Sequence, residues 1–429
     1  MSTIGGLLSV RAVLRAQYLD RDTLGRATLA GLRGALSQAR TRVSAYRDDD
    51  RYDIGRTWDI SDFARLPMLR KADVLAAGED RFRDPAFTRD RVTVYTTSGT
   101  SGQILEAWHD PGNYAHDRAC NIRRFAAAGG RYRPWSRLVH FKPFPLDTAW
   151  YQRLGIFRRS VVFSALPVRT RIEQLLRIRP HAMIGYPVML RDLLRGLRPD
   201  ELATLRRTLR AVFTESELLT PEVRAQLTSG FGVPVFNEYS AYELMHIAYD
   251  CAEGQLHVAE DRVHVEIVDA DGRPVPDGTE GHVVVTGWRE RAMPLLRYWL
   301  GDRATRLTGR CGCGRTFARL ELTKGRADDY VVLPDGERIY AGTFIGMAIS
   351  TPGVAECMVR QDPAGNITVW LVPDVDTAAG RGFDDLAREA RAWLHGSAGR
   401  PFDLDVRRAS ALELTSGGKG RFVVSEFRG

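Results

Sequence analysis

The chain has 429 residues and a mass of 48.0 kDa, which exceeds the size at which one hydrophobic core usually stops growing, so two domains are expected. Hydrophobic residues make up 44% and charged residues 27% of the sequence, which are average values for globular proteins, and no low-complexity tract suggests disorder. No apolar run reaches about 18 residues, which excludes a membrane-spanning helix and leads us to expect a cytoplasmic protein without a membrane partner.

The formal charge of +8 raises the question of a nucleic-acid partner. The arginines, however, are spread from Arg11 to Arg428 instead of forming one basic stripe, so nucleic acid is not the favoured partner. Arginine outnumbers lysine by 57 to 4, a bias that reflects base composition of the genome. Each lysine is therefore informative, and one of them, Lys419, lies in a glycine-rich segment.

The first predicted element is an amphipathic helix or helix pair over residues 11–46, where Leu, Val and Ala recur at helical spacing. From about residue 91 to 300, short β-branched runs alternate with helical stretches, which is typical of α/β layering. The expected strands include 138–141, 161–163, 211–213 and 233–236, and the expected helices include 172–176 and 188–197.

The pattern changes at residues 263–286 to a strand, a turn and a second strand, which predicts an antiparallel β subdomain. After residue 325 a new pattern of alternating helices and strands begins, which suits a small separate domain. The sequence thus predicts an α/β fold with a large multilayered N-terminal domain over residues 1–324, which includes the antiparallel subdomain. A small α+β domain is predicted over residues 325–429.

Residues 96–102 read Thr-Thr-Ser-Gly-Thr-Ser-Gly, directly after the strand-like run at 91–95. Glycine permits positive φ and a close approach of the backbone, so successive N–H groups can converge on an anion while the hydroxyls add donors. This favours a loop that binds nucleotide phosphates, although such clusters also form plain surface turns.

Two further segments suit a nucleotide. After the strand at 233–236, Tyr239 precedes Glu243 by four residues, and an aromatic ring can stack on a purine while a carboxylate holds Mg²⁺. Farther along, Asp302 follows a glycine and suits two vicinal ribose hydroxyls. Taken singly, a strand end with a buried Tyr and an ordinary Asp turn explain these residues as well.

Two segments place charges near the predicted small domain. Residues 324–329, Lys-Gly-Arg-Ala-Asp-Asp, lie at the predicted boundary, where a solvated linker is the ordinary alternative. Residues 416–421, Ser-Gly-Gly-Lys-Gly-Arg, present Lys419 on a flexible loop, and a disordered tail is the alternative. The lysine ammonium could meet negative charge that develops on a phosphate or a carboxylate.

An odd number of cysteines, five, in a cytosolic chain argues against a disulfide framework. Cys311 and Cys313 flank a glycine, and Cys251 and His257 lie upstream across the predicted strand pair. Three thiolates and one imidazole satisfy a tetrahedral, structural Zn²⁺. Three reduced thiols and a hydrogen-bonded histidine are the alternative.

Taken in order, these segments resemble the adenylate-forming superfamily, which includes acyl-CoA synthetases, adenylation domains of peptide synthetases and luciferases. Within it, the sequence is similar to phenylacetate-CoA ligase-like proteins, including the capsule-biosynthesis branch. Residues 96–102 resemble the phosphate loop, 239–243 the Tyr-Gly-x-Ser/Thr-Glu motif, 297–302 the Arg-Tyr-x-x-x-Asp motif and 325–329 the Gly-Arg-x-Asp-Asp hinge. Lys419 falls at the C-terminal lysine, and some relatives carry a zinc beside the predicted cysteine site.

The resemblance implies a role for each matching residue. It assigns the ATP phosphates to the loop residues Ser98, Gly99, Thr100, Ser101 and Gly102. It assigns the rest of the nucleotide to Ser216, Glu217, Tyr239, Asp302 and Arg326. Glu243 would bind Mg²⁺, Asp328 would be the hinge of a mobile C-terminal domain, and Lys419 would stabilise the adenylation transition state.

The implied reaction is ATP-dependent adenylation of a small carboxylic acid, with aromatic acids among the candidates, followed by acyl transfer. CoA is the favoured acceptor, although residues 331–340 lack the Arg-Gly-x-Asn stretch of the CoA ligases. An amine or carrier-protein acceptor, or an adenylyltransferase that stops after the first step, are the alternatives among enzymes. A zinc-stabilised nucleic-acid-binding protein is the alternative outside them.

Overall fold

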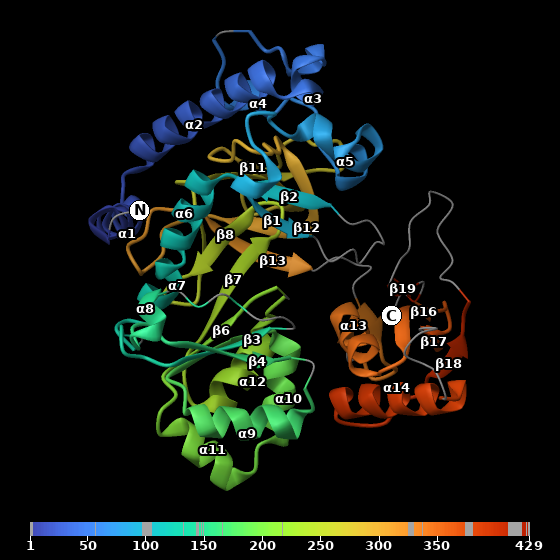
Figure 1. Cartoon of the computed structure of the whole chain (residues 1–429). Helices are drawn as coiled ribbons and strands as arrows, with labels where there is room; N and C mark the ends of the chain where they lie inside the picture. The colour runs from blue at the N-terminus through green and yellow to red at the C-terminus, as the bar shows by residue number, and fades with distance from the viewer. Residues whose placement is uncertain are drawn as a thin grey trace.

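The computed structural model describes two bodies, a large one from the N-terminus to β13 and a smaller one that holds the C-terminal elements (Figure 1). The described residues are 3–55, 57–96, 105–131, 133–142, 146, 148, 150–164, 166–216, 218–324, 330–336, 338–373, 381–410, 423–425 and 427. No helix among them is both long enough and apolar enough to cross a membrane.

The N-terminal helices confirm the predicted helix pair. Helix α1 (Thr3–Ala16) is followed by α2 (Arg21–Arg42), whose N-cap Asp20 accepts a hydrogen bond from the backbone N–H of Thr23. Buried residues recur along α2 at helical spacing, from Leu24 through Leu32 to Ala39, so one face packs on the large body. The short helices after it are α3 (Ser44–Arg47), η1 (Asp50–Tyr52), α4 (Ile60–Phe63), α5 (Lys71–Ala77), η2 (Glu79–Phe82) and η3 (Arg89–Arg91).

The main sheet has eleven strands among the described residues, in the order β10-β11-β12-β13-β9-β8-β7-β6-β5-β3-β4. Its parallel half consists of β3 (Leu138–Lys142), β4 (Arg159–Phe163), β5 (Ala182–Gly185), β6 (Ala211–Thr214) and β7 (Val235–Ala241). The helices of this half are α6 (Pro111–Cys120), α7 (Ile122–Ala127), α8 (Trp150–Arg153), α9 (Val168–Ile178), α10 (Pro187–Gly196), α11 (Pro199–Arg206) and α12 (Pro221–Phe231).

Burial explains why the parallel strands read as continuous apolar runs. Every residue of β5 and β6 is buried, as expected for strands with helices on both faces. Helices α9, α10 and α12 pack together below the sheet in Figure 1, and Ile172, Leu190 and Leu227 join one core cluster there. The carboxyl ends of these strands are thereby held rigidly at one edge, where ligands of open α/β sheets bind.

The antiparallel half continues the same sheet. It consists of β8 (Met245–Asp250), β9 (Leu256–Val258), β10 (Val263–Val268), β11 (Glu280–Gly287), β12 (Tyr298–Leu307) and β13 (Arg319–Lys324). The predicted strand, turn and strand at 263–286 is confirmed by the antiparallel pair β10 and β11. Strands β1 (Thr93–Thr96) and β2 (Glu106–His109) form a separate antiparallel pair.

The structure corrects the prediction for residues 233–236, which was a strand with Tyr239 on the loop behind it. Strand β7 runs from Val235 to Ala241, so Tyr239 lies inside the strand. The extension follows from a second partner, because Tyr239 is opposite Ala248 in the antiparallel strand β8. Strand β7 is therefore parallel to β6 on one side and antiparallel to β8 on the other.

The C-terminal part has a core of its own. It contains the pair β14 (Tyr330–Val332) and β15 (Arg338–Tyr340), and a four-stranded sheet of β16 (Val354–Gln361), β17 (Ile367–Pro373), β18 (Asp405–Arg408) and β19 (Val423–Ser425). Helices α13 (Ala341–Ser350) and α14 (Phe383–Ala398) accompany the sheet. The buried members of this core all lie between Val331 and Val423. The exact boundary at residues 324 and 325 stays a prediction, because 325–329 are outside the described residues.

Helices α6 and α7 are fixed to the sheet by buried charges. His246 of β8 lies between two carboxylates, 2.8 Å from Asp117 of α6 and 3.2 Å from Glu238 of β7. Arg124 of α7 forms an ion pair with the same Glu238. Burial lowers the pKa of His246, but the charges of Asp117 and Glu238 outweigh burial and raise the pKa to about 9.

This arrangement predicts a loss of stability in mild alkali. A histidine has a pKa of about 6.5 in an unfolded chain, so its stabilising contribution is complete below that pH and disappears as the pH rises through about 9. We expect the free energy of unfolding in urea to fall by roughly 3 kcal/mol across this range because of His246. His246→Gln should remove this part of the pH dependence of the free energy of unfolding, and His395→Gln on α14 is the matched control. The same pH dependence in wild type and His246→Gln would contradict the assignment.

Candidate nucleotide and metal sites

Two of the predicted nucleotide residues are in direct contact. The hydroxyl of Tyr239 on β7 donates a hydrogen bond of 2.7 Å to Oδ2 of Asp302 on β12. Three strands, β13, β9 and β8, lie between β7 and β12 in the sheet order, so the antiparallel half must curl for the two side chains to meet.

Glu243 lies beside the same two strands, in the turn between β7 and β8. The hydroxyl of Tyr298 on β12 donates to its Oε1 at 3.1 Å, and both side chains are buried. Sequence reasoning assigned no role to Tyr298, although the residue directly follows Arg297 in the predicted motif. Two hydrogen-bonded pairs, Tyr239 with Asp302 and Glu243 with Tyr298, therefore join the region of β7 to β12, and we call these four residues the β7/β12 cluster.

Ser216 marks the start of the loop that leaves β6. Its φ is +66°, a left-handed conformation that is uncommon for residues other than glycine and is often found at functional sites. Strands β6 and β7 are neighbours, and Thr214 at the end of β6 donates a 2.9 Å hydrogen bond to Asn237 of β7. Ser216 thus leaves the sheet next to the strand that carries Tyr239.

Several predicted residues lie outside the described residues. They are Ser98, Gly99, Thr100, Ser101 and Gly102 of the loop that connects β1 to β2, together with Glu217, Arg326, Asp328 and Lys419. Their roles remain predictions.

Arg297, the first residue of the motif that ends in Asp302, holds the backbone in place. It has a left-handed φ of +48°, and its buried guanidinium donates to Glu266 at 3.1 and 3.2 Å, to the carbonyl oxygen of Gly272 at 2.7 Å, and to that of Leu66. These contacts tie the segment before β12 to the loop after α4 and to the turn after β10.

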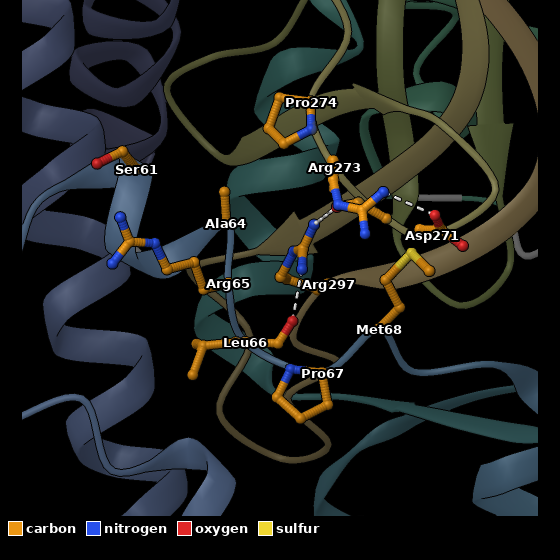
Figure 2. A pocket seen from close by; sticks show the side chains of 11 residues that line it. Ser61, Ala64, Arg65, Leu66, Pro67, Met68, Asp271, Arg273, Pro274 and Arg297 are labelled. Atoms are coloured by element: carbon orange, nitrogen blue, oxygen red, sulfur yellow. Dashed lines mark hydrogen bonds and ion pairs between the residues drawn. The ribbon is translucent and has the colours of Figure 1, made fainter.

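A cleft of about 550 Å³ lies against this arginine (Figure 2). Its arginines already have carboxylate partners: Arg65 is 3.4 Å from Asp62, and Arg273 is 2.7 Å from Asp271. Arg297 contributes only the buried side chain described above. We therefore separate this cleft from the β7/β12 cluster and assign no chemistry to it.

The four predicted metal ligands are brought together. Their ligand atoms all lie within 4.8 Å of one another. The Sγ atoms of Cys251 and Cys311 are 3.7 Å apart, and Sγ of Cys313 is 3.5 Å from Nε2 of His257. Tetrahedral zinc with ordinary bond lengths separates two sulfurs by about 3.8 Å, and a sulfur from a nitrogen by about 3.6 Å.

The surroundings fix the orientation of His257. Nδ1 of His257 is 2.9 Å from the carbonyl oxygen of Phe317, so this nitrogen carries the proton and Nε2 presents its lone pair to the thiols. The backbone N–H of Arg315 also points to Sγ of Cys313 at 3.4 Å. Both features are typical of zinc sites with thiolate and imidazole ligands.

A second group, His116, Cys120 and Asp261, is equally compact but unsuited to a metal. Arg123 donates to both oxygens of Asp261, at 2.7 and 2.9 Å, and its guanidinium is 3.4 Å from Sγ of Cys120. Burial raises the pKa of Cys120 to about 12, so the thiol keeps its proton. The group is a buried ion pair that supports helices α6 and α7.

Comparison with known families identifies the larger part of the chain. The AMP-binding enzymes match residues 33–289, a segment that contains Tyr239, Glu243 and most of the main sheet. The chain belongs to the AMP-binding enzyme family. The predicted adenylate-forming, phenylacetate-CoA ligase-like resemblance is thereby confirmed, and the protein is a ligase.

Individual relatives of this AMP-binding enzyme support the same family assignment. The phenylacetate-coenzyme A ligase of Thermus thermophilus is 28% identical over 372 residues, which cover 81% of this chain and 80% of the relative. Protein CapK of Staphylococcus aureus is 23% identical over 265 residues, or 60% of this chain and 55% of CapK. The crystal structure of 2-hydroxyisobutyryl-CoA ligase in the postadenylation state has a TM-score of 0.65 at 18% identity, covering 96% of this chain and 91% of that one. This likeness confirms the predicted α/β fold class with its smaller C-terminal domain.

Proposed function

We propose that this enzyme activates a small carboxylic acid with ATP and transfers the acyl group to CoA. In the first step a carboxylate oxygen attacks the α-phosphorus, the bond to pyrophosphate breaks, and an acyl-adenylate forms. In the second step the CoA thiol attacks the acyl carbon, and AMP leaves. The first step needs charge stabilisation at phosphorus and a fixed position for the acid, because a free carboxylate is a poor acyl donor.

The β7/β12 cluster is the observation that carries the proposal. Asp302 would hold the ribose hydroxyls, and the ring of Tyr239 would lie along the adenine, with Ser216 at the same edge. Glu243, held by Tyr298, would bind Mg²⁺, which neutralises charge on the phosphate oxygens when bound. All of these residues except Asp302 and Tyr298 lie within the segment that the AMP-binding enzymes match, residues 33–289.

The undescribed residues complete the proposal through their sequence motifs. The hydroxyls and amides of residues 98–102 would hold the phosphates, and Glu217 and Arg326 would contact the nucleotide. Lys419 would place its ammonium beside the charge that develops during adenylation. Asp328 would be the hinge about which the small domain turns to exchange Lys419 for the acceptor.

The acceptor is inferred from the relatives. The Thermus thermophilus enzyme is named a phenylacetate-coenzyme A ligase, and the match covers 80% of its length, so CoA is the first choice and aromatic acids belong in the substrate panel. An amine, a carrier protein, or no acceptor at all are outcomes that acceptor screening after adenylation would distinguish.

Acid-dependent exchange of pyrophosphate into ATP tests the first step. We expect Lys419→Ala to lower exchange by about 100-fold or more, because a charge-stabilising donor is lost. Asp302→Asn should raise the KM for ATP about tenfold through a weakened ribose contact, and Glu243→Gln should raise the Mg²⁺ requirement. Asp271→Asn, an exposed turn residue, is the control. Undiminished exchange in both Lys419→Ala and Asp302→Asn would contradict the proposal.

We also infer that Cys251, His257, Cys311 and Cys313 hold a structural zinc ion. Support comes from the separations of 3.7 and 3.5 Å, which fit a tetrahedral ion, and from the backbone partner of His257. With four protein ligands the ion would have no open position, so it would stabilise the fold between β8, β9 and the segment before β13 and take no part in adenylation.

Metal analysis of the purified protein tests this inference. We expect one zinc ion per chain by mass spectrometry, and Cys311→Ser should abolish it and lower the melting temperature by about 10 °C or more, since folding and metal binding are coupled. Cys357→Ser, a buried cysteine of the C-terminal core, is the matched control and should retain zinc. A zinc-free protein that melts at the same temperature in chelator would contradict the inference.

A further inference from the structure

The carboxyl ends of the parallel strands β3 and β6 carry charged groups to which the proposed nucleotide contacts assign no role. Lys142 is the last residue of β3, and Glu215 directly follows β6. Nζ of Lys142 is 2.6 Å from Oε1 of Glu215, and Nε2 of His140, on β3, donates to the same oxygen at 2.9 Å. The sequence signal for this group was present, because Lys142 is one of only four lysines.

These groups are almost fully buried. The Lys142 side chain is 13% exposed and that of Glu215 is 6% exposed. Burial raises the pKa of Glu215, but the His140 hydrogen bond and the Lys142 charge outweigh burial and hold the pKa well below its usual range. The carboxylate likewise raises the pKa of Lys142 against the effect of burial, so the two groups form a charged pair.

Aromatic rings lie beside the pair and next to Glu243 of the proposed nucleotide site. The ammonium of Lys142 is 6.0 Å from the centre of the Tyr186 ring, which follows β5. Tyr242, the residue before Glu243, is 37% exposed, and its ring centroid is 5.7 Å from that of Tyr95. An acid that reacts at the phosphate beside Glu243 would therefore extend along these rings toward Lys142 and Glu215.

The pair still has hydrogen-bonding capacity. The contacts of Glu215 with Lys142 and His140 are made through Oε1, whereas Arg124 lies 3.9 Å from Oε2, beyond hydrogen-bond reach. An ammonium carries three donors, and Glu215 Oε1 takes one of those on Lys142. A carboxylate and an ammonium together can therefore both accept a hydrogen bond from a ligand and donate one to it.

Building on the proposed function, the geometry points to a carboxylic acid that carries a hydroxyl group, with the hydroxyl donating to Oε2 of Glu215 and accepting from Lys142. An ammonium group on the substrate would be repelled by the positive charge of Lys142, and a second carboxylate would be repelled by the negative charge of Glu215. A hydrocarbon would displace water from both charges without replacing its hydrogen bonds, which is strongly unfavourable in a buried site. A hydroxyl satisfies both partners because it is a donor and an acceptor.

Pyrophosphate exchange with matched pairs of acids tests this inference. The pairs differ only by one hydroxyl: benzoate and its three hydroxybenzoates, phenylacetate and 4-hydroxyphenylacetate, butyrate and 3-hydroxybutyrate, isobutyrate and 2-hydroxyisobutyrate. We expect at least one hydroxylated acid to exceed its partner by about 100-fold in kcat/KM, because sites built for a hydroxyl reject analogues that lack it. Equal kcat/KM values for the two acids of every pair would overturn the inference.

Variants assign the preference to the pair. Glu215→Gln and Lys142→Met should each reduce the ratio between the two acids to below about fivefold, with folding checked by thermal melting. Glu201→Gln removes an equally buried glutamate, paired with Arg169 on helix α9, and should leave the ratio unchanged. A ratio that survives both site variants would overturn the assignment.

Failure of the proposed function would look different. If no acid in the panel drives exchange while a fluorescent ATP analogue still binds in competition with ATP, the hydroxyl inference is overturned and the nucleotide site stands. If the ATP analogue does not bind, the proposed function itself is contradicted.

Discussion

Strand β7 is the constraint on which the rest of the site depends. It is parallel to β6 and antiparallel to β8, so one strand belongs to both halves of the main sheet. Because β7 also carries Glu238 and Tyr239 and leads into Glu243, the helix-covered half and the curled antiparallel half meet at these side chains. The hydrogen bond from Tyr239 to Asp302 then closes the antiparallel half back onto β7. A displacement of β7 would disrupt the proposed ribose and metal contacts at once.

The charges around β7 link stability to the site. Arg124 lies between Glu238 and Glu215, so the network that holds helix α7 continues into the pair of Glu215 and Lys142. Removing one member of such a network leaves an unpaired buried charge, which costs several kcal/mol. The same low exposure strengthens hydrogen bonds to a ligand, because water does not compete for the donors and acceptors. Rigidity and recognition therefore come from the same residues.

Much of this organisation was predictable from the sequence, since periodicity gave the N-terminal helices, the α/β alternation and the strands β10 and β11. The resemblance of ordered motifs led to the family and to Tyr239, Glu243 and Asp302, and the four metal-ligand residues were found from their chemistry. The length of β7 was not predictable, because it depends on pairing with β8. Tyr298, His140 and Glu215 were missed for the same reason: their partners are distant in sequence, and only the curl of the sheet and the alignment of strand ends bring them together.

The central claim is that Tyr239, Asp302 and Glu243 surround one nucleotide. A crystal structure of the chain with ATP and Mg²⁺ tests it most directly. The account predicts ribose hydroxyls within about 3 Å of the Asp302 carboxylate, and the metal bound at Glu243 on the phosphate side. Density for ATP elsewhere, for example in the cleft between Arg65 and Arg273, with the β7/β12 cluster unchanged and empty of nucleotide, would contradict it.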